Sequence, residues 1–209
     1  MMASALIERE LERGRLPLRT GCFVAVVGPS GAGKDTLIGF AKDRLAAESD
    51  VHFVRRIITR PSNSEAESHD TLTLPEFEAA EKDGAFALSW RAHGLAYGLP
   101  ATIDTHMENG MAVVANLSRS ALPAARERYG NLIVVLVTAD PHILAERLGR
   151  RARESSDEVL ARMSRVSGDR QHLADAIEIA NNGTAEEAGL ALVEVIRKAL
   201  ARAAVSWTV

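Results

Sequence analysis

The chain contains very little cysteine and no long apolar run. Cys22 is its single cysteine, which excludes an internal disulfide and is typical of a reducing compartment. The longest apolar segments, Cys22–Val27 and Leu132–Val137, are far shorter than the roughly 20 residues of a membrane-spanning helix. Residues 1–20 alternate glutamate and arginine without the apolar segment of a secretory signal, and their glutamates count against a transit peptide. We therefore expect a cytoplasmic protein that does not bind membranes.

The charge balance lacks the basic excess of most nucleic-acid-binding domains. Lys and Arg number 25 against 28 Asp and Glu, which gives a formal net charge of −3. A length of 209 residues suits one globular domain that buries roughly 70% of its unfolded surface. We expect an N-terminal arm over 1–20, a single domain over 21–209 and no nucleic-acid partner.

Short apolar, mostly β-branched runs alternate with helical stretches along the chain. This order is typical of βαβ units around a central parallel sheet, and hence of an α/β fold. A capping-box pattern, Thr73-Leu-Pro-Glu76, predicts the start of one helix. The predicted strands are 22–27, 52–59, 86–90, 111–115, 132–137 and 176–180. The predicted helices are 33–47, 73–83, 101–108, 120–128, one that begins at 140–141 and runs into the charged stretch 147–158, 157–172 and 185–204. Residues 61–70 are predicted as a loop and residues 94–100 as turns.

The segment Gly28-Pro-Ser-Gly-Ala-Gly33-Lys34 has the spacing of a phosphate-binding loop between a strand and a helix. Glycines let successive backbone N–H groups converge on phosphate oxygens at a helix N-terminus, and Lys34 would reach the β- and γ-phosphates of ATP. Asp35 stands where a Ser or Thr normally contacts Mg²⁺, so we expect Asp35 to serve Mg²⁺ directly or through a water, in a linked exchange with Asn116. The predicted ATP-binding residues are Gly28, Pro29, Ser30, Gly31, Ala32, Gly33, Lys34, Asp35 and Thr36.

This loop, together with Ile58-Thr-Arg60, resembles the guanylate kinase superfamily. The motifs Gly33-Lys-Asp35, Glu67-Ser-His69 and Phe86 to Gly98 resemble more closely the ribose 1,5-bisphosphate phosphokinases of phosphonate breakdown. That resemblance covers about residues 24–183. It implies a three-layer α/β/α nucleoside-monophosphate-kinase-like fold, with an acceptor-binding segment near 55–100 and a lid near 147–162. It also implies ATP-dependent phosphorylation of ribose 1,5-bisphosphate to 5-phosphoribosyl 1-diphosphate.

Departures from the guanylate kinase pattern fall on the acceptor side. Asn63 replaces a second arginine, Leu99 replaces a small hydroxyl residue, and Asn116 and Ser118 replace two acidic residues. A site that reads a purine base loses several kcal/mol when its polar readers are lost. This favours a changed acceptor over two alternatives, a guanylate or other nucleoside monophosphate kinase and a catalytically silent binding module of guanylate kinase type.

The resemblance also implies roles for individual residues. Arg60 is the first candidate for gripping an acceptor phosphate, whereas Arg55 and Arg56 fit a solvated strand edge equally well. Arg151 and Arg162 fall at lid positions that close over ATP, and Asn181 falls near the adenine. The predicted catalytic residues are Lys34, Arg60, Arg151 and Arg162; the predicted acceptor-binding residues are Arg60, Glu67, His69, His93, Tyr97, Asn116, Ser118 and Arg119. Trp90 is expected in the core, the partner is a small-molecule phosphate acceptor, and a homodimer is compatible with this function.

Overall fold

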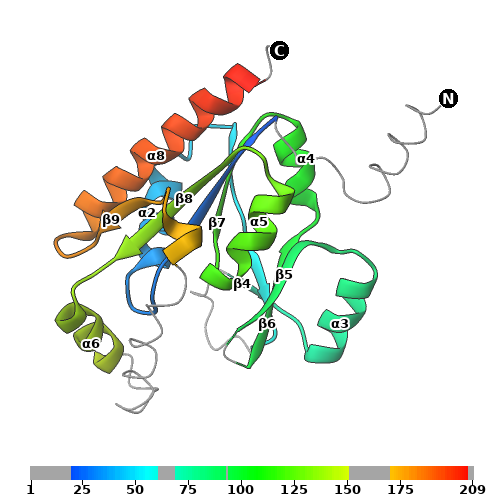
Figure 1. Cartoon of the computed structure of the whole chain (residues 1–209), viewed down its shortest axis with the longest axis horizontal. Coiled ribbons are helices and arrows are strands. Elements are labelled where there is room, and N and C mark those ends of the chain that lie inside the picture. The colour runs from blue at the N-terminus through cyan, green and yellow to red at the C-terminus, as the bar shows by residue number, and fades with distance from the viewer. Residues whose placement is uncertain (1–19, 61–68, 93, 151–169, 207–209) are drawn as a thin grey trace.

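A five-stranded parallel sheet forms the centre of the molecule (Figure 1). The computed structural model describes residues 20–60, 69–92, 94–150 and 170–206. The strand order is β2-β7-β1-β8-β9, and every neighbouring pair in it is parallel. These strands are β2 (Val51–Phe53), β7 (Ala112–Asn116), β1 (Cys22–Val27), β8 (Leu132–Thr138) and β9 (Ile177–Ala180).

The central strand β1 contributes side chains to two separate cores. All six of its residues are fully buried, because successive side chains point to opposite faces of the sheet and helices cover both faces. Cys22, Val24 and Val26 pack in one core, and Phe23, Ala25 and Val27 pack in the other. Helices α2 (Lys34–Arg44) and α8 (Ala185–Ser206) contribute to the first core, and α4 (Thr102–Glu108) and α5 (Leu122–Arg128) contribute to the second.

A second, four-stranded sheet lies beside the central one, with strand order β4-β3-β6-β5. Strands β3 and β4 are parallel, whereas β6 runs antiparallel to both β3 and β5. The helix that follows β4 begins with the predicted capping box, in which the Thr73 and Glu76 side chains each bond the other's backbone N–H. The bounds are β3 (Arg56–Ile58), β4 (His69–Thr71), α3 (Leu74–Lys82), β5 (Phe86–Ala92) and β6 (Leu95–Pro100).

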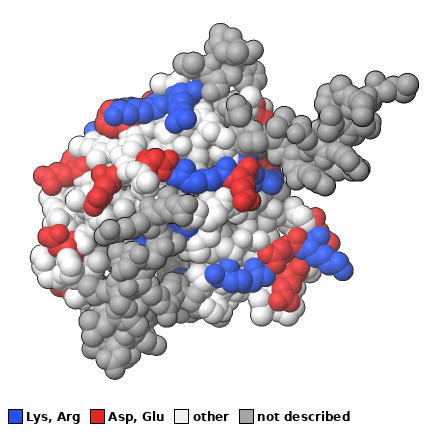
Figure 2. Space-filling view, viewed as in Figure 1, with Lys and Arg blue, Asp and Glu red and all other residues white. Residues whose placement is uncertain are grey.

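The remaining described elements follow α4 and β8. A 3-10 turn η1 (Arg119–Ala121) leads into α5, α6 (Pro141–Arg150) follows β8, and η3 (Arg170–Leu173) precedes β9. Among the residues the structure describes, no helix is long and apolar enough to cross a membrane. The surface shown in Figure 2 intersperses acidic and basic side chains over its described part.

The structure confirms the α/β fold with a parallel central sheet and corrects three local predictions. The run 52–59 is two strands in two different sheets, because the chain leaves β2 after Phe53 and enters β3 at Arg56. Residues 94–100 form strand β6 where turns were predicted, and His69 and Asp70 belong to β4 where a loop was predicted. The predicted helix over 157–172 falls largely outside the described residues, and its final residues form η3. Trp90 packs in the second core, as predicted.

Candidate active site

The phosphate-binding loop connects the carboxyl end of β1 to the first turn of α2. Gly28 has φ +152°, and a β-carbon there would lie 2.2 Å from the Val137 carbonyl oxygen of the adjacent strand. Gly33, the N-cap of α2, has φ +93°, and within the described residues no side chain caps this helix. The loop therefore needs glycine at both ends, and it leaves the helix N-terminus open to an anion.

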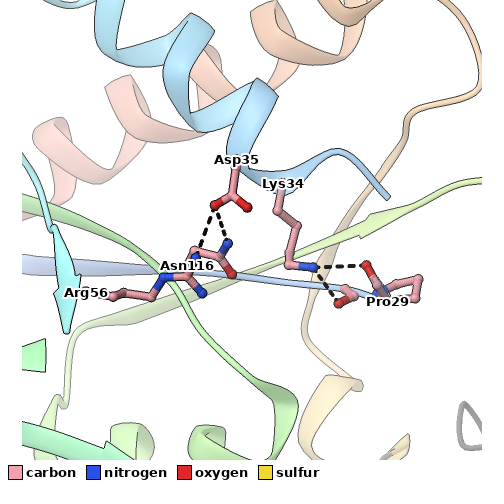
Figure 3. A network of polar contacts seen from close by, with 6 residues as sticks. Pro29, Lys34, Asp35, Arg56 and Asn116 are labelled. Carbon is pink, nitrogen blue, oxygen red and sulfur yellow. Dashed lines mark hydrogen bonds and ion pairs between the residues drawn. The ribbon is translucent and has the colours of Figure 1, made fainter. Parts of the chain in front are cut away.

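Lys34 lies across the loop in this structure. Its Nζ donates hydrogen bonds to the carbonyl oxygens of Gly28 at 2.8 Å and Pro29 at 2.9 Å (Figure 3). The ammonium group is thus already held at the loop where phosphates would bind. Exchanging carbonyl oxygens for anionic phosphate oxygens would strengthen its hydrogen bonds, because charge-assisted bonds are the stronger kind.

The side chains of Asn181 and Arg147 lie next to Gly33, where the loop meets α2. The Asn181 side chain is buried and its Nδ2 donates to the Ala32 carbonyl oxygen at 2.8 Å. A β-carbon on Gly33 would lie 2.4 Å from this Nδ2 and 3.9 Å from Nη1 of Arg147. Within the described part of the chain, Asn181 Oδ1 and Arg147 Nη1 are buried atoms without a hydrogen-bond partner. Asn181 was expected near adenine, and the structure adds that it braces the loop itself.

Asp35 faces the end of β7 rather than standing alone in solvent. Its Oδ1 accepts a hydrogen bond of 2.7 Å from Asn116 Nδ2 and one of 3.3 Å from Arg56 Nη2 (Figure 3). Asn116 is buried at the carboxyl end of β7, and the two positions of the predicted linked exchange are in direct contact. The Asp35 side chain is 56% exposed, which leaves its carboxylate accessible.

The structure separates the two adjacent arginines that the sequence could not distinguish. The Arg55 side chain is 62% exposed and pairs with Asp70 at 2.7 Å. The Arg56 side chain is only 16% exposed and lies between the loop and the second sheet. Burial lowers the pKa of Arg56 from its ordinary value; Asp35 and Tyr97 act against this effect and Arg60 adds to it. Burial thus distinguishes Arg56 from Arg55, which the sequence could not do.

Two of the six described acceptor-side candidates, His69 and Tyr97, lie in the second sheet, and a third, Arg60, lies just beyond it. Tyr97 in β6 stacks on Trp90 across the β5–β6 pair, with ring centroids 5.4 Å apart. His69 is buried in β4, and its carbonyl oxygen accepts a hydrogen bond from Arg55 Nη2. Arg60 is exposed just beyond the end of β3. His69 is the strand partner of Arg56, and Tyr97 and Arg60 both act on the Arg56 charge, so the three candidates gather around Arg56.

Ser118, Arg119 and Leu99 have structural roles that the sequence did not reveal. Ser118 caps η1, its Oγ accepting from the Ser120 N–H at 3.3 Å, and Arg119 is the first residue of that turn. Leu99 is fully buried in the second core, so its replacement of a hydroxyl residue concerns packing.

Four predicted site residues lie outside the described residues. They are Glu67, His93, Arg151 and Arg162. In the part of the chain that the structure describes, no group of three or more His, Cys, Asp or Glu could hold a metal ion by itself.

Comparison with known proteins identifies the family. No family model matches the chain. It is 49% identical over 201 residues to the ribose 1,5-bisphosphate phosphokinase PhnN of Chelativorans sp., a match that covers 96% of each chain. It is 44% identical over 180 residues to the enzyme of the same name from Agrobacterium fabrum, covering 84% of this chain and 96% of that relative. The fold is similar to a crystal structure of guanylate kinase from Anaplasma phagocytophilum, with a TM-score of 0.61, 15% identity and 86% of each chain covered. The chain therefore belongs to the family of ribose 1,5-bisphosphate phosphokinases.

Proposed function

We propose that this enzyme transfers the γ-phosphoryl group of ATP to the 1-phosphate of ribose 1,5-bisphosphate. The observation that supports this most is the family match over nearly the full length, combined with an intact phosphate-binding loop at the carboxyl end of a parallel sheet. The neutral residues Asn116 and Ser118, where guanylate kinases place acids, agree with an acceptor that has no purine base. The product is 5-phosphoribosyl 1-diphosphate, and the resemblance implies a role in phosphonate breakdown.

The reaction requires charge placement more than proton removal. An anionic oxygen of the 1-phosphate attacks the γ-phosphorus and forms a new P–O bond. The bond from the γ-phosphorus to the β,γ-bridging oxygen breaks, and that oxygen leaves with the electron pair on ADP. No general base is needed because the attacking oxygen is already ionised, so catalysis depends on positioning and on cations that stabilise the transferring group.

Lys34 is the cation that the structure places in the loop itself, and replacing it tests the donor site. Lys34→Ala should reduce kcat by roughly 10²–10³, because one preorganised charge-stabilising group is removed. The side chain lies on the loop and not in either core, so the melting temperature without ligand should change little. Steady-state rates and thermal unfolding measure both quantities. A rate within a few-fold of the parent enzyme would place Lys34 away from the reacting phosphates.

Mg²⁺ fits the carboxylate of Asp35. Both hydrogen bonds that described residues make to this carboxylate end on Oδ1. Oδ2 therefore stays available for a hard cation or one of its waters, and Mg²⁺ prefers oxygen ligands and usually keeps several waters. Bound there with ATP, Mg²⁺ would neutralise charge on the phosphates. The loop N–H groups and Lys34 would fix the same phosphates from the other side.

On the acceptor side, Arg60 is proposed to grip a phosphate, and Tyr97 and His69 to meet phosphate or sugar oxygens. Glu67, His93, Asn116, Ser118 and Arg119 remain predicted acceptor contacts, with Asn116 also bonded to Asp35 and Ser118 also capping η1. Arg151 and Arg162 remain predicted lid arginines. A cytoplasmic location, a homodimer and the absence of nucleic-acid binding also stay predictions from the sequence.

An acceptor panel tests the proposed function. The enzyme with ATP and Mg²⁺ is assayed against ribose 1,5-bisphosphate, ribose 5-phosphate, GMP and AMP. We expect kcat/KM with GMP to be at least about a hundredfold lower than with ribose 1,5-bisphosphate, roughly 2.7 kcal/mol of discrimination. Detection of 5-phosphoribosyl 1-diphosphate by mass spectrometry identifies the product. A preference for GMP would replace this proposal with a nucleoside monophosphate kinase.

A further inference from the structure

Two adjacent arginines enter the second sheet, and their side chains have different partners. Arg55 directly precedes β3 and Arg56 is its first residue. The Arg55 side chain is 62% exposed and pairs with Asp70, whereas the Arg56 side chain is 16% exposed and reaches Asp35. Figure 3 shows the Arg56 guanidinium beside Asn116 and beneath Asp35. Arg56 is therefore a buried cation at the boundary between the donor loop and the second sheet.

The hydrogen bonding of Arg56 is far from complete. A guanidinium has five N–H donors, and among the described residues Arg56 makes a single hydrogen bond, of 3.3 Å, to Asp35 Oδ1. The same oxygen accepts a shorter bond of 2.7 Å from Asn116. A buried charge is costly unless it is paired and hydrogen-bonded, so this guanidinium has both the unused donors and the energetic reason to bind an anion. One long contact to a half-exposed carboxylate does not meet that need.

The position of Arg56 indicates which anion it would bind. Its partner Asp35 directly follows Lys34, the lysine expected at the β- and γ-phosphates. Arg60 lies exposed beyond the end of β3, further along the chain from the loop contact. An acceptor with two phosphates presents one of them to the donor and the other away from it. Arg56, which lies beside the loop, is placed to bind the phosphate that faces the donor.

We propose that Arg56 binds the phosphate of the acceptor that receives the γ-phosphoryl group, the 1-phosphate of ribose 1,5-bisphosphate. This inference rests on the proposed function and adds a specificity-determining residue to it. Arg56 would hold the attacking oxygen's phosphate against the donor loop through paired N–H bonds, a geometry that suits guanidinium and phosphate. Asp35, which is itself bonded to Asn116, contacts the guanidinium until the acceptor arrives.

Two acceptors that differ only in the 1-phosphate test the assignment. Binding of ribose 1,5-bisphosphate and of ribose 5-phosphate is measured by calorimetry on the full chain saturated with ADP and Mg²⁺, so that no turnover occurs. Arg56→Met should weaken binding of ribose 1,5-bisphosphate by about tenfold to a hundredfold, since hydrogen bonds to charged groups have that magnitude. Binding of ribose 5-phosphate should change by less than about threefold, because it lacks the group that Arg56 contacts.

Arg55→Met is the matched control. It removes the adjacent exposed arginine, which contacts Asp70 and the His69 carbonyl oxygen, so any loss of affinity should be equal for both ligands and their affinity ratio should stay unchanged. Arg56→Lys keeps the charge but loses the paired geometry, so it should weaken binding of ribose 1,5-bisphosphate by an intermediate factor. It also serves if Arg56→Met fails to fold. Equal weakening of both ligands by Arg56→Met or Arg56→Lys, or no weakening by either variant, would overturn the assignment. Failure of the parent enzyme to bind or phosphorylate ribose 1,5-bisphosphate would instead overturn the proposed function.

Discussion

Replacing Asn181 should loosen the phosphate-binding loop from a position 149 residues away from its contact in the sequence. In Asn181→Ala, the Ala32 carbonyl oxygen loses its 2.8 Å hydrogen bond from Asn181 Nδ2. Both residues are buried, at 3% and 0% exposure, so water replaces this donor poorly. Leaving a buried acceptor unsatisfied costs about 1–3 kcal/mol, and we expect about 2 kcal/mol here.

That cost has two measurable consequences. In a protein of this size 1 kcal/mol lowers the melting temperature by about 2–4 °C, so Asn181→Ala should melt roughly 4–8 °C below the parent. The loop that loses its brace is also the predicted ATP site, so ATP should bind about tenfold more weakly, which corresponds to 1.4 kcal/mol. Thermal unfolding with and without ATP separates the two effects, because the stability that bound ATP adds rises with the logarithm of the ATP concentration divided by its Kd.

Two companion variants sharpen the test. Asn181→Asp keeps the shape but sets a carboxylate oxygen against the Ala32 carbonyl oxygen, so it should be more destabilising than alanine. Asn182→Ala removes the adjacent, exposed asparagine, which bonds Asp140 and not the loop, so ATP affinity should stay unchanged. If Asn181→Ala keeps the parent melting temperature and ATP affinity, Asn181 does not brace the loop.

Two other positions give independent checks. Gly28 has φ +152°, and Gly28→Ala would place a β-carbon 2.2 Å from the Val137 backbone oxygen, which cannot move aside as a side chain can. We therefore expect the free energy of unfolding to fall by several kcal/mol in chemical denaturation and ATP to bind weakly. Stability equal to that of the parent would contradict the close approach. His52 stacks on His106 with centroids 3.9 Å apart, and burial, followed by the charge of His106, lowers the pKa of His52 below its ordinary 6.5. The folded state therefore binds fewer protons, and stability should fall as the pH drops below about 6.5 toward the lower folded-state pKa. His52→Phe keeps a ring for stacking and should flatten the decline of stability between pH 7 and 5 in urea titrations. As a control, His142→Gln replaces an exposed histidine and should leave the decline unchanged. The same decline in His52→Phe as in the parent would exclude the histidine pair as the source of the pH dependence.

The central sheet could be predicted from the sequence because its signals are local. An uninterrupted apolar strand, a glycine-rich turn and a helix follow one another within residues 22–44, and each has its own sequence signature. Strand β6 escaped prediction because Gly98 and Pro100 are common in turns. The structure shows why a glycine is needed in this strand: a β-carbon on Gly98 would lie 2.6 Å from the Phe86 ring. Glycine here permits close packing across two strands, which single-sequence patterns do not encode.

The donor half of the site was more predictable than the acceptor half for a related reason. The loop residues lie within nine consecutive positions, so their spacing alone identifies them. Arg56 and Asp35 are 21 residues apart and meet only because the chain leaves β2 of the central sheet and enters β3 of the second sheet. The sequence could not place that crossing, because no glycine or proline marks it between Phe53 and Arg56. Burial then distinguishes Arg56 from Arg55. In a strand as short as β3, the tertiary fold decides which side chains are buried, so the sequence alone does not show it.

The contact between Asp35 and Asn116 makes the linked exchange testable. Asn116→Asp would set a second carboxylate at the 2.7 Å position where Nδ2 now donates to Asp35. Two negative charges about 3 Å apart repel by roughly 5 kcal/mol at an effective dielectric constant near 20, so the pair would retain a proton or separate. Asn116→Asp should therefore lower stability and raise the Mg²⁺ concentration that half-saturates ATP binding.

Adding Asp35→Ser to Asn116→Asp returns a hydroxyl to the loop and leaves one carboxylate on the strand, the usual arrangement of such sites. The double variant should thus bind Mg²⁺ and ATP more tightly than Asn116→Asp alone, with a coupling of about 1.5 kcal/mol or more across the cycle of four proteins in calorimetry. Additive effects of the two substitutions would show that the two positions changed independently.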